Sequence, residues 1–259
     1  LVEVVSLARA LVGDLGFALP EAPTPADVQA AVGATMERLS GVTAEDLARL
    51  PMALDPNVVA ALRIQNDTMS SAYLAAPNLL AIMACNIVRL TVEKGVCKES
   101  PYGFAVLALV LSAGNAIDVA YGVGKLATEL LGRVEDRAVQ PRTLHVVTSF
   151  VRPFVEPMRV SIEEARRVFR IGMDVGDFEY AAWALHTMVR DGLFGGLPLD
   201  ELEPMTARSM AILEHHRQVA AIGVQAPLAP MGGKPPRRAA EPPRPLGPPL
   251  AEDARPALF

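Results

Sequence analysis

The sequence is poor in cysteine, and its uninterrupted apolar runs are short. Cys85 and Cys97 are its two cysteines, too few for a disulfide framework and without the spacing of a metal site. They suit a reducing compartment, so we expect a cytoplasmic protein. The most apolar stretch, residues 105–120, is interrupted by polar residues such as Asn115 and Asp118. Since a membrane span needs roughly 18 uninterrupted apolar residues, this stretch predicts a buried helix instead.

Basic residues are outnumbered by acidic ones. The formal net charge is -5 and the isoelectric point is about 5.5. Proteins that bind nucleic acid usually carry a basic patch or a strongly basic domain. We therefore expect no nucleic-acid partner.

Histidines are few, and their positions do not suit a metal. His215 and His216 are adjacent, so on a helix they point about 100° apart and cannot easily bind one ion. His145 lies in a mostly apolar segment with no second ligand one turn away, which is typical of a histidine packed between helices. His186 fits either a surface position or a contact at a helix end. We predict no metal site and no cofactor.

No catalytic set of acid, base and nucleophile stands out. Glu163 stands three and four residues before Arg166 and Arg167, which is the spacing of ion pairs on an exposed helix face. Cys85 lies in an apolar run and is predicted to be a small core residue, whereas Cys97 follows a helix end and could be exposed. The chain is therefore predicted not to be an enzyme in its own right.

The stretch "YGVGKLATELL" at 121–131 is similar to the end of a phosphate-binding loop. That loop needs a glycine, four residues, and then Gly-Lys-Ser/Thr. Val119 stands where the first glycine should be, and Leu126 replaces the hydroxyl that would bind magnesium. We therefore expect no ATP binding here. Saturable, magnesium-dependent ATP binding that is lost in Lys125→Ala would overturn this expectation.

Helical periodicity dominates the chain, and no segment alternates with period two for long enough to be a strand. Gly95 is placed to end one helix, and Ser100 is predicted to cap the next, with Pro101 in its first turn. The last main helix is predicted from near Pro198 towards Val224. The sequence thus predicts an all-α protein of roughly nine to eleven helices of ordinary length.

Two weakly matching phrases indicate repeated helical hairpins. "DVAYG" at 118–122 parallels "DFEYA" at 177–181, and each has an acid three residues before a tyrosine. The pattern resembles tetratricopeptide-type repeats, which predicts tandem antiparallel hairpins in an α-solenoid. Tyr121 and Tyr180 are then candidates for interaction or for packing at helix crossings. We also expect Gly176 to end one helix and Asp177 to cap the next.

Composition divides the chain in two. Residues 1–224 form the predicted helical-repeat region. Residues 225–259 are dense in proline, which removes backbone donors, and we predict a disordered tail there.

Several longer phrases resemble one family of large multidomain signalling proteins. They cover much of residues 1–222 and read "LSGVTAEDLARLPMALDPNVVAALRI" (39–64), "AYLAAPNLLAIMACNIVRLTVEKGVCKESPYGF" (72–104), "DVAYGVGKLATELLGR" (118–133) and "GMDVGDFEYAAWALH" (172–186). In that family a serine/threonine kinase-like domain precedes a STAND-type ATPase, this helical region, a GAF domain and often a sensor histidine kinase. The chain departs from the family at Val146 and Val147, where a tryptophan-containing phrase is usual, and its tail does not resemble a GAF domain.

The resemblance implies that the chain is a fragment lacking the kinase, ATPase and histidine kinase domains. It also implies a helix at 121–131, in which Gly122 and Gly124 allow close packing and Lys125 is solvated. The function expected is a non-catalytic signal-transduction segment that couples flanking domains or binds a partner protein. The alternative is a ligand-sensing helical bundle with a buried apolar pocket.

Overall fold

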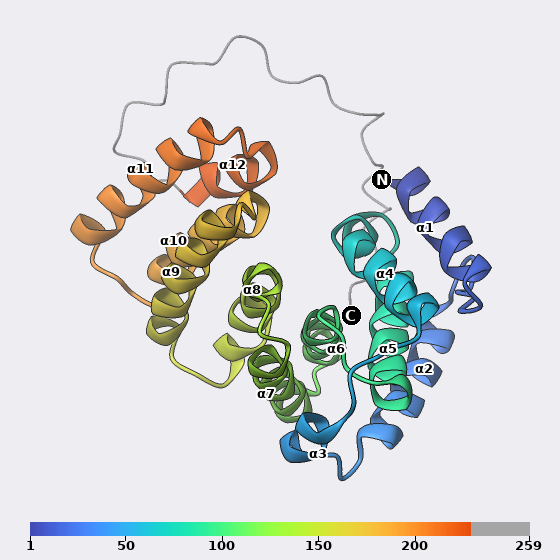
Figure 1. The fold of residues 1–259 in the computed structure, drawn as a ribbon. Helices are drawn as coiled ribbons and strands as arrows, with labels where there is room; N and C mark the ends of the chain where they lie inside the picture. Colours follow the sequence, from blue (N-terminus) through green and yellow to red (C-terminus); the bar gives the residue numbers. More distant parts are fainter. Residues whose placement is uncertain (229–259) are drawn as a thin grey trace.

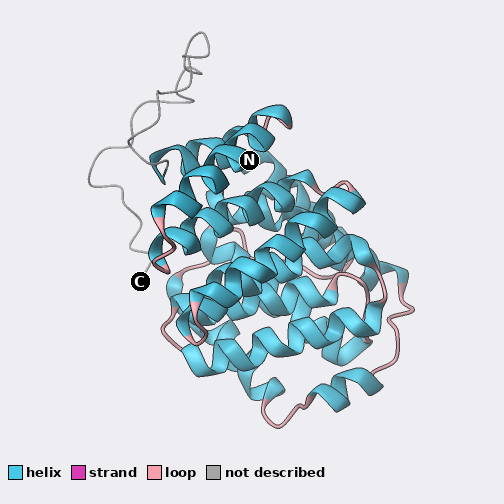
Figure 2. Ribbon diagram, turned by 90° about the vertical axis from the view of Figure 1, so that its left-hand side faces the viewer, coloured by secondary structure: helices cyan, strands magenta, loops and turns pink. Residues whose placement is uncertain are grey.

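The structure, a computed structural model, describes residues 1–228, and this part of the chain is all-α. The α-helices are α1 (Val2–Asp14), α2 (Pro25–Leu39), α3 (Ala44–Arg49), α4 (Pro56–Ala75), α5 (Pro77–Lys94), α6 (Ser100–Ala113), α7 (Ile117–Val134), α8 (Gln140–Phe150), α9 (Met158–Val175), α10 (Phe178–Phe194), α11 (Leu199–His215) and α12 (Val219–Gln225). Three 3-10 turns are η1 (Arg137–Val139), η2 (Arg152–Phe154) and η3 (Ala226–Leu228). The described residues contain no strand, so the all-α prediction is confirmed, with twelve α-helices in place of roughly nine to eleven. Figure 2 shows them lying side by side, joined by loops.

Several helices begin and end where the sequence supplies the capping groups. Thr24 and Thr43 cap α2 and α3, and each forms a reciprocal capping box with an aspartate three residues later. Gly95 ends α5 as predicted. Gly176 ends α9 in the left-handed conformation, and Asp177 accepts a hydrogen bond from the Tyr180 backbone N–H, so the predicted turn between α9 and α10 is confirmed.

Two predicted helix boundaries are wrong. Glu99, not Ser100, is the N-cap of α6, because the Ser100 hydroxyl accepts a hydrogen bond from the Cys97 backbone N–H instead of capping the helix. The predicted last helix is two helices, since α11 ends at His215 and Arg217 takes a positive φ of 54°. The predicted tail lies outside the described residues from 229 onwards, whereas α12 and η3 occupy 219–228.

Helices close in sequence pack against one another along an arc (Figure 1). α1 and α2 pack on α4 and α5 respectively, α5 packs on α6, α6 packs on α7 and α8, and α9 packs on α8 and α10. α11 and α12 cover α10 at the far end of the arc. Among the described residues no helix is both long and apolar enough to cross a bilayer.

The apolar core is unevenly divided along the arc. One large cluster runs through α1–α7, which we call the N-terminal unit, and includes Val146 and Val147 of α8 and Val151, which directly follows that helix. The C-terminal unit, α9–α12, is held by two smaller clusters. One of these also contains residues of α7, η1 and α8, so it joins the two units. Helix α8 therefore lies between them and packs on both.

Candidate functional site

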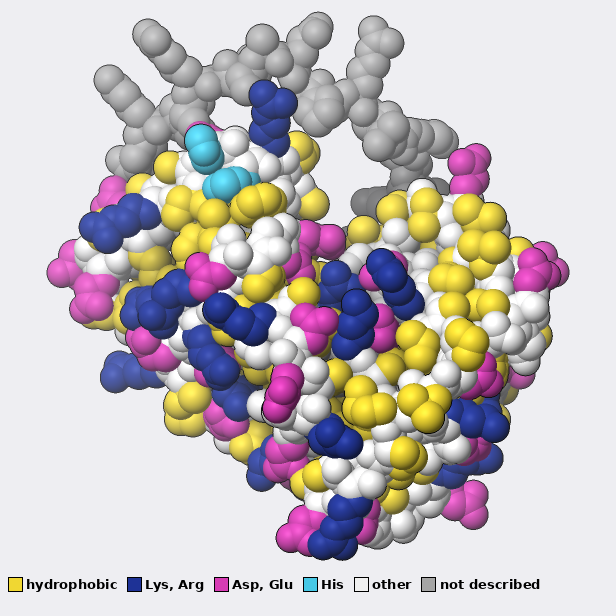
Figure 3. Space-filling model, in the orientation of Figure 1, with side chains coloured by type: hydrophobic (Ala, Val, Ile, Leu, Met, Phe, Trp, Pro, Cys, Tyr) yellow, Lys and Arg dark blue, Asp and Glu magenta, His cyan; other side chains and the backbone are white. Residues whose placement is uncertain are grey.

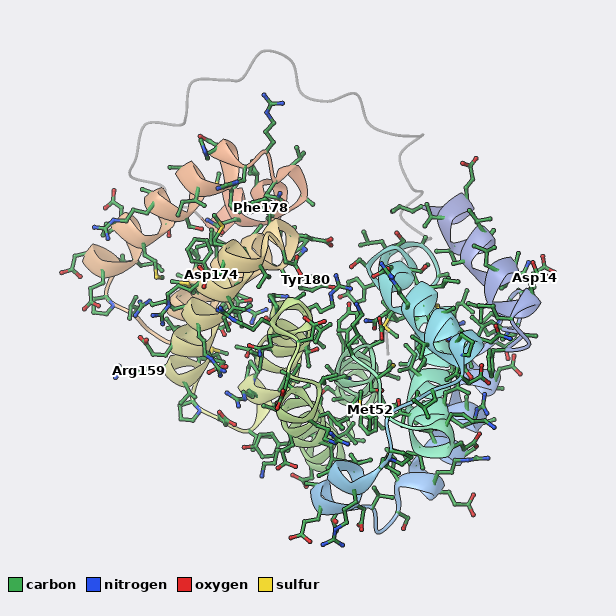
Figure 4. All side chains as sticks on the ribbon, viewed as in Figure 1. Asp14, Met52, Arg159, Asp174, Phe178 and Tyr180 are labelled. Carbon is green, nitrogen blue, oxygen red and sulfur yellow. The ribbon has the colours of Figure 1, made fainter. Side chains whose placement is uncertain are left out.

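Helices α4, α6, α8 and α10 bring a group of polar side chains together between the two units. We call this group the polar junction, and its members are Asp67, Ser70, Tyr102, Arg142, His145, Asp177 and Tyr180. In Figure 4 the Tyr180 label marks the place where α10 faces α4 and α6. Figure 3 shows Lys, Arg, Asp and Glu side chains gathered on the surface between the two sides of the arc.

Tyr180 is the centre of the hydrogen-bond network. Its hydroxyl lies 3.1 Å from the Ser70 Oγ on α4 and 2.5 Å from the Tyr102 hydroxyl on α6. The two tyrosine rings meet edge to face with centroids 6.1 Å apart. Burial, and then the neighbouring Tyr180, raise the pKa of Tyr102 well above its ordinary value. Both hydroxyls therefore stay protonated and available as donors near neutral pH.

Arg142 on α8 links α4 to α10 electrostatically. Its guanidinium donates to an Asp67 carboxylate oxygen at 3.3 Å and lies 5.7 and 5.9 Å from the ring centroids of Tyr102 and Tyr180. Its Nε is 4.0 Å from the Asp177 Oδ2, and neither atom has a hydrogen-bond partner among the described residues. Burial raises the pKa of Asp177, although the Tyr180 backbone N–H and Arg142 oppose the shift.

His145 extends the network along α8. Its ring lies 5.7 Å from that of Tyr180, and its Nδ1 is 3.3 Å from the Ser149 Oγ, which lies 2.7 Å from the Thr187 Oγ1 on α10. Burial, and then the positive charge of Arg190, lower the pKa of His145 to about 3. The prediction of a histidine packed between helices is confirmed, and its ring is neutral near pH 7.

A second buried charge pair lies at the other end of α10. Arg190 donates from its Nε to the Asp191 Oδ1 at 2.7 Å and from an Nη to the Ser149 carbonyl at 3.3 Å. The Asp191 side chain is 1% exposed, and its Oδ2 has no partner among the described residues. Burial raises the pKa of Asp191 in opposition to the Arg190 hydrogen bond. Polar contacts thus join α8 to α10 along much of their length.

The two tyrosines singled out in the sequence occupy different environments. Tyr180 is buried in the polar junction. Tyr121 is half-buried on α7, donates to Glu156 at 2.8 Å, and has the Lys125 ammonium 4.5 Å from its ring centroid. These contacts of Tyr121 and those of Tyr180 share no residue. The two phrases also sit differently on their helices, because Asp118 lies inside α7 whereas Asp177 precedes α10.

The loop-like stretch at 121–131 lies within α7, not between a strand and a helix. A Cβ on Gly124 would lie 3.4 Å from the Val151 Cγ1, which fits the close packing expected there. Gly122 has nothing within 4 Å of a built Cβ, so the expectation of close packing at that residue is wrong. Lys125 is exposed, as expected.

The remaining residues singled out in the sequence lie in surface ion pairs or in the core. Glu163 pairs with Arg166 at 2.8 Å as predicted, whereas Arg167 pairs with Glu164 at 2.9 Å instead. Cys85 is buried as predicted. Cys97 is also buried, which corrects the expectation of exposure, because the chain after Gly95 packs beside the backbone of residues 51–53.

The adjacent histidines His215 and His216 lie near the surface of the protein. The His216 ring stacks on Phe178 at 4.9 Å, and His215 is exposed. His186 is half-buried, and its ring is 6.2 Å from that of Trp183, within α10. It lies in the middle of α10, and its Nδ1 is buried without a hydrogen-bond partner among the described residues. The described residues contain no group of three metal-ligating side chains.

Sequence reasoning found Tyr180 as an interaction candidate, Asp177 as a helix cap and His145 as a histidine packed between helices. It missed the other four members of the polar junction. Asp67, Ser70 and Tyr102 lie on helices whose apolar pattern is strong, so their polar atoms carry no signal of a shared partner. Arg142 stands one turn before His145, and a cation next to a predicted interface histidine was the available hint.

Comparison with known proteins gives one partial similarity. The chain is 27% identical over 169 residues to "Hybrid signal transduction histidine kinase G" of Dictyostelium discoideum, and the match covers 63% of this chain. It spans 5% of the length of that relative. No family model matches, and the search of solved structures gave no significant match.

Proposed function

We propose that this chain is a non-catalytic segment of a multidomain signal-transduction protein, in which it couples neighbouring domains by contact. The partial similarity to a hybrid histidine kinase supports the signalling context. The observation that carries the coupling role is the polar junction, because it ties helices from both units of the arc through Tyr180 and Arg142. A cytoplasmic setting beside ATPase and kinase domains is part of the proposal.

The arrangement of helices supports the finer fold proposal of an α-solenoid. Each of the pairs α4–α5, α6–α7 and α9–α10 consists of consecutive packed helices, and each pair packs on a neighbour in sequence. Solenoids of this kind are joined mainly to nearest neighbours, so their curvature can change at modest cost. The polar junction adds a longer-range link between α4 and α10. The curvature of the solenoid would then differ according to whether the contacts of the junction are formed or broken.

The contacts favour coupling over the alternative of a ligand sensor. Two surface hollows in the described residues, one lined by α9, α10 and α11 and one by α3 and α7, hold only about 10 and 40 Å³. Small-molecule sites usually measure about 300–1,000 Å³ and are more enclosed. The histidine and carboxylates of the junction are engaged with other side chains of the protein, which favours a structural link over catalysis.

Tyr121 is the better of the two proposed interaction residues. Its half-buried ring and its ion-paired surroundings suit an interface anchor, whereas the buried Tyr180 suits internal packing. Binding of a neighbouring domain to the surface of α7 around Tyr121 would then depend on that residue.

The test is calorimetric titration of the purified chain with each domain encoded beside it in the parent gene. We expect saturable binding to at least one of them. Tyr121→Ala should weaken that binding with only a small drop in melting temperature, because its ring is half-buried against the core. The matched variant Tyr73→Ala, at a half-exposed tyrosine, should leave the binding intact. Absence of affinity for every flanking domain at high concentration would refute the proposal.

A further inference from the structure

We propose that the polar junction is a latch: its contacts hold α10 against α4 and α6, and when they separate the C-terminal unit swings away from the N-terminal unit. This inference deepens the proposed function, and the role of the latch in coupling domains rests on that function. The latch itself is a property of this chain alone and can be tested without a partner.

The contacts of α10 with α4 and α6 are mainly polar. Tyr180 is the α10 residue that belongs to the large apolar cluster, and its hydroxyl makes the hydrogen bonds to Ser70 and Tyr102. The other link is the chain from Asp67 through Arg142 to Asp177. Groups of this kind are hydrated when they separate, so opening exchanges protein contacts for water contacts.

Two polar atoms of the closed junction have no hydrogen-bond partner within residues 1–228. The Arg142 Nε and the Asp177 Oδ2 lie 4.0 Å apart without a hydrogen-bond partner among the described residues. A desolvated polar atom without a partner opposes the closed state. Hydration of these two atoms on opening offsets part of the cost of separating the latch, and this offset is what would let a neighbouring domain shift the balance.

Helix α8 stays with the N-terminal unit in this movement, so the contacts of Ser149 with Thr187 and Arg190 on α10 separate together with the latch. Val146, Val147 and Val151 are buried in the large cluster, and Gly124 of α7 allows Val147 and Val151 to approach closely. The bend between α8 and α9 follows at η2, which contains Pro153, and Pro157 directly precedes α9. This segment connects the part that stays to the part that moves.

A small apolar cluster provides the pivot. It joins Leu131, Val139 and Leu144 on one side to Val168, Ile171 and Ala184 on the other. Because it contains few side chains, α9 can rotate on it without exposing a large apolar area. The latch and the pivot thus lie on different contacts between the same two units.

Distances between spin labels test the latch. Leu74→Cys on α4 and Glu214→Cys on α11 place labels at exposed positions of the two units, and the native cysteines are buried. We expect one main distance and a minor, longer one. Arg142→Gln should raise the longer population by roughly fivefold, the factor that corresponds to the net value of about one hydrogen bond.

Tyr102→Phe is the second variant, because it removes one hydroxyl without changing the shape of the core, and it should raise the longer population in the same direction. Arg166→Gln is the matched control, since Arg166 pairs with Glu163 on the exposed face of α9, within the C-terminal unit, and does not reach α4. It should change nothing. If Arg142→Gln does not fold, Tyr102→Phe decides the question.

An unchanged distance distribution in folded Tyr102→Phe and Arg142→Gln would overturn the latch, as would an equal change in Arg166→Gln. Failure of the proposed function has a different signature. In that case the labels would report opening in the isolated chain, but no flanking domain would bind or shift the populations.

Discussion

The N-terminal and C-terminal units are both built from packed helices, yet they bury different kinds of interior. In the N-terminal unit one continuous apolar cluster extends through α1–α7 and includes Phe104, Leu107 and Met83. The C-terminal unit has two small clusters, and of the largest fully buried side chains only Leu202 and Leu213 belong to its described residues. Where the two units meet, polar contacts of the junction take the place of part of the apolar packing.

This difference in core size implies a difference in local stability. Burial of apolar surface is the main favourable contribution to folding, so the N-terminal unit should resist opening more than the C-terminal unit. The polar junction adds specificity to their contact but little apolar burial. The following variants are ordered by the size of the effect that this comparison predicts.

The largest effect is expected in the continuous core. Phe104 on α6 is fully buried, and Phe104→Ala should lower the free energy of unfolding by about 3–5 kcal/mol. Leu213→Ala in the C-terminal unit should cost nearer to 2 kcal/mol, because a small cluster can collapse around the cavity. Urea denaturation followed by circular dichroism measures both. Equal losses would show that the two units are equally well packed.

The next effect concerns pH. The folded-state pKa of His145 is about 3, against an ordinary value of 6.5, so the unfolded chain binds the proton more readily. Its contribution to stability is therefore present above pH 6.5 and is lost as the pH falls from 6.5 towards 3. Between pH 6.5 and 5 the loss should be about 2 kcal/mol.

Comparison of variants isolates this contribution from that of other titrating groups. His145→Gln should remove about 2 kcal/mol of the pH dependence between those two pH values, measured as the shift in the urea midpoint. His215→Gln, at an exposed histidine, is the control and should retain it. An identical pH dependence in wild type and His145→Gln would contradict the buried, neutral ring.

A smaller effect separates the two tyrosines. Tyr180→Phe removes two hydrogen bonds and leaves the Ser70 and Tyr102 hydroxyls without that partner, which should cost about 1–2 kcal/mol. Tyr121→Phe removes one hydrogen bond near the surface and should cost less than about 0.5 kcal/mol. Thermal denaturation in parallel would measure both, and the reverse order would place the critical tyrosine outside the junction.

The smallest effect concerns the turn into α10. Asp177→Ala removes the N-cap and should cost about 1 kcal/mol of stability. Asp177→Asn keeps a capping oxygen but loses the charge facing Arg142, so it should differ from wild type by only a few tenths of a kcal/mol. If Asn proves as costly as Ala, the carboxylate acts mainly through Arg142 and not as a cap.

The sequence predicted the parts of this structure that depend on neighbouring residues. The helical class, the end of α5 at Gly95 and the turn at Gly176 and Asp177 follow from local propensity and capping, and all three are confirmed. The break after His215 was missed because no proline or glycine marks it.

The polar junction could not be predicted in the same way. The Ser70 and Tyr180 side chains that form it are 110 residues apart in sequence, and their meeting depends on how the helices curve in space. The weak repeat of Asp and Tyr pointed to Tyr180 but matched it with Tyr121, which contacts different neighbours. Local pattern thus located a residue of the site without identifying its partners.

Native-state hydrogen exchange tests the central comparison most directly, because it measures the opening of each helix separately. We predict that amides of α10–α12 open at a lower free energy than those of α4–α6. Arg142→Gln should lower protection in α10–α12 further and leave α4–α6 unchanged. Equal protection of both units in the wild type, with a uniform loss in Arg142→Gln, would contradict the account.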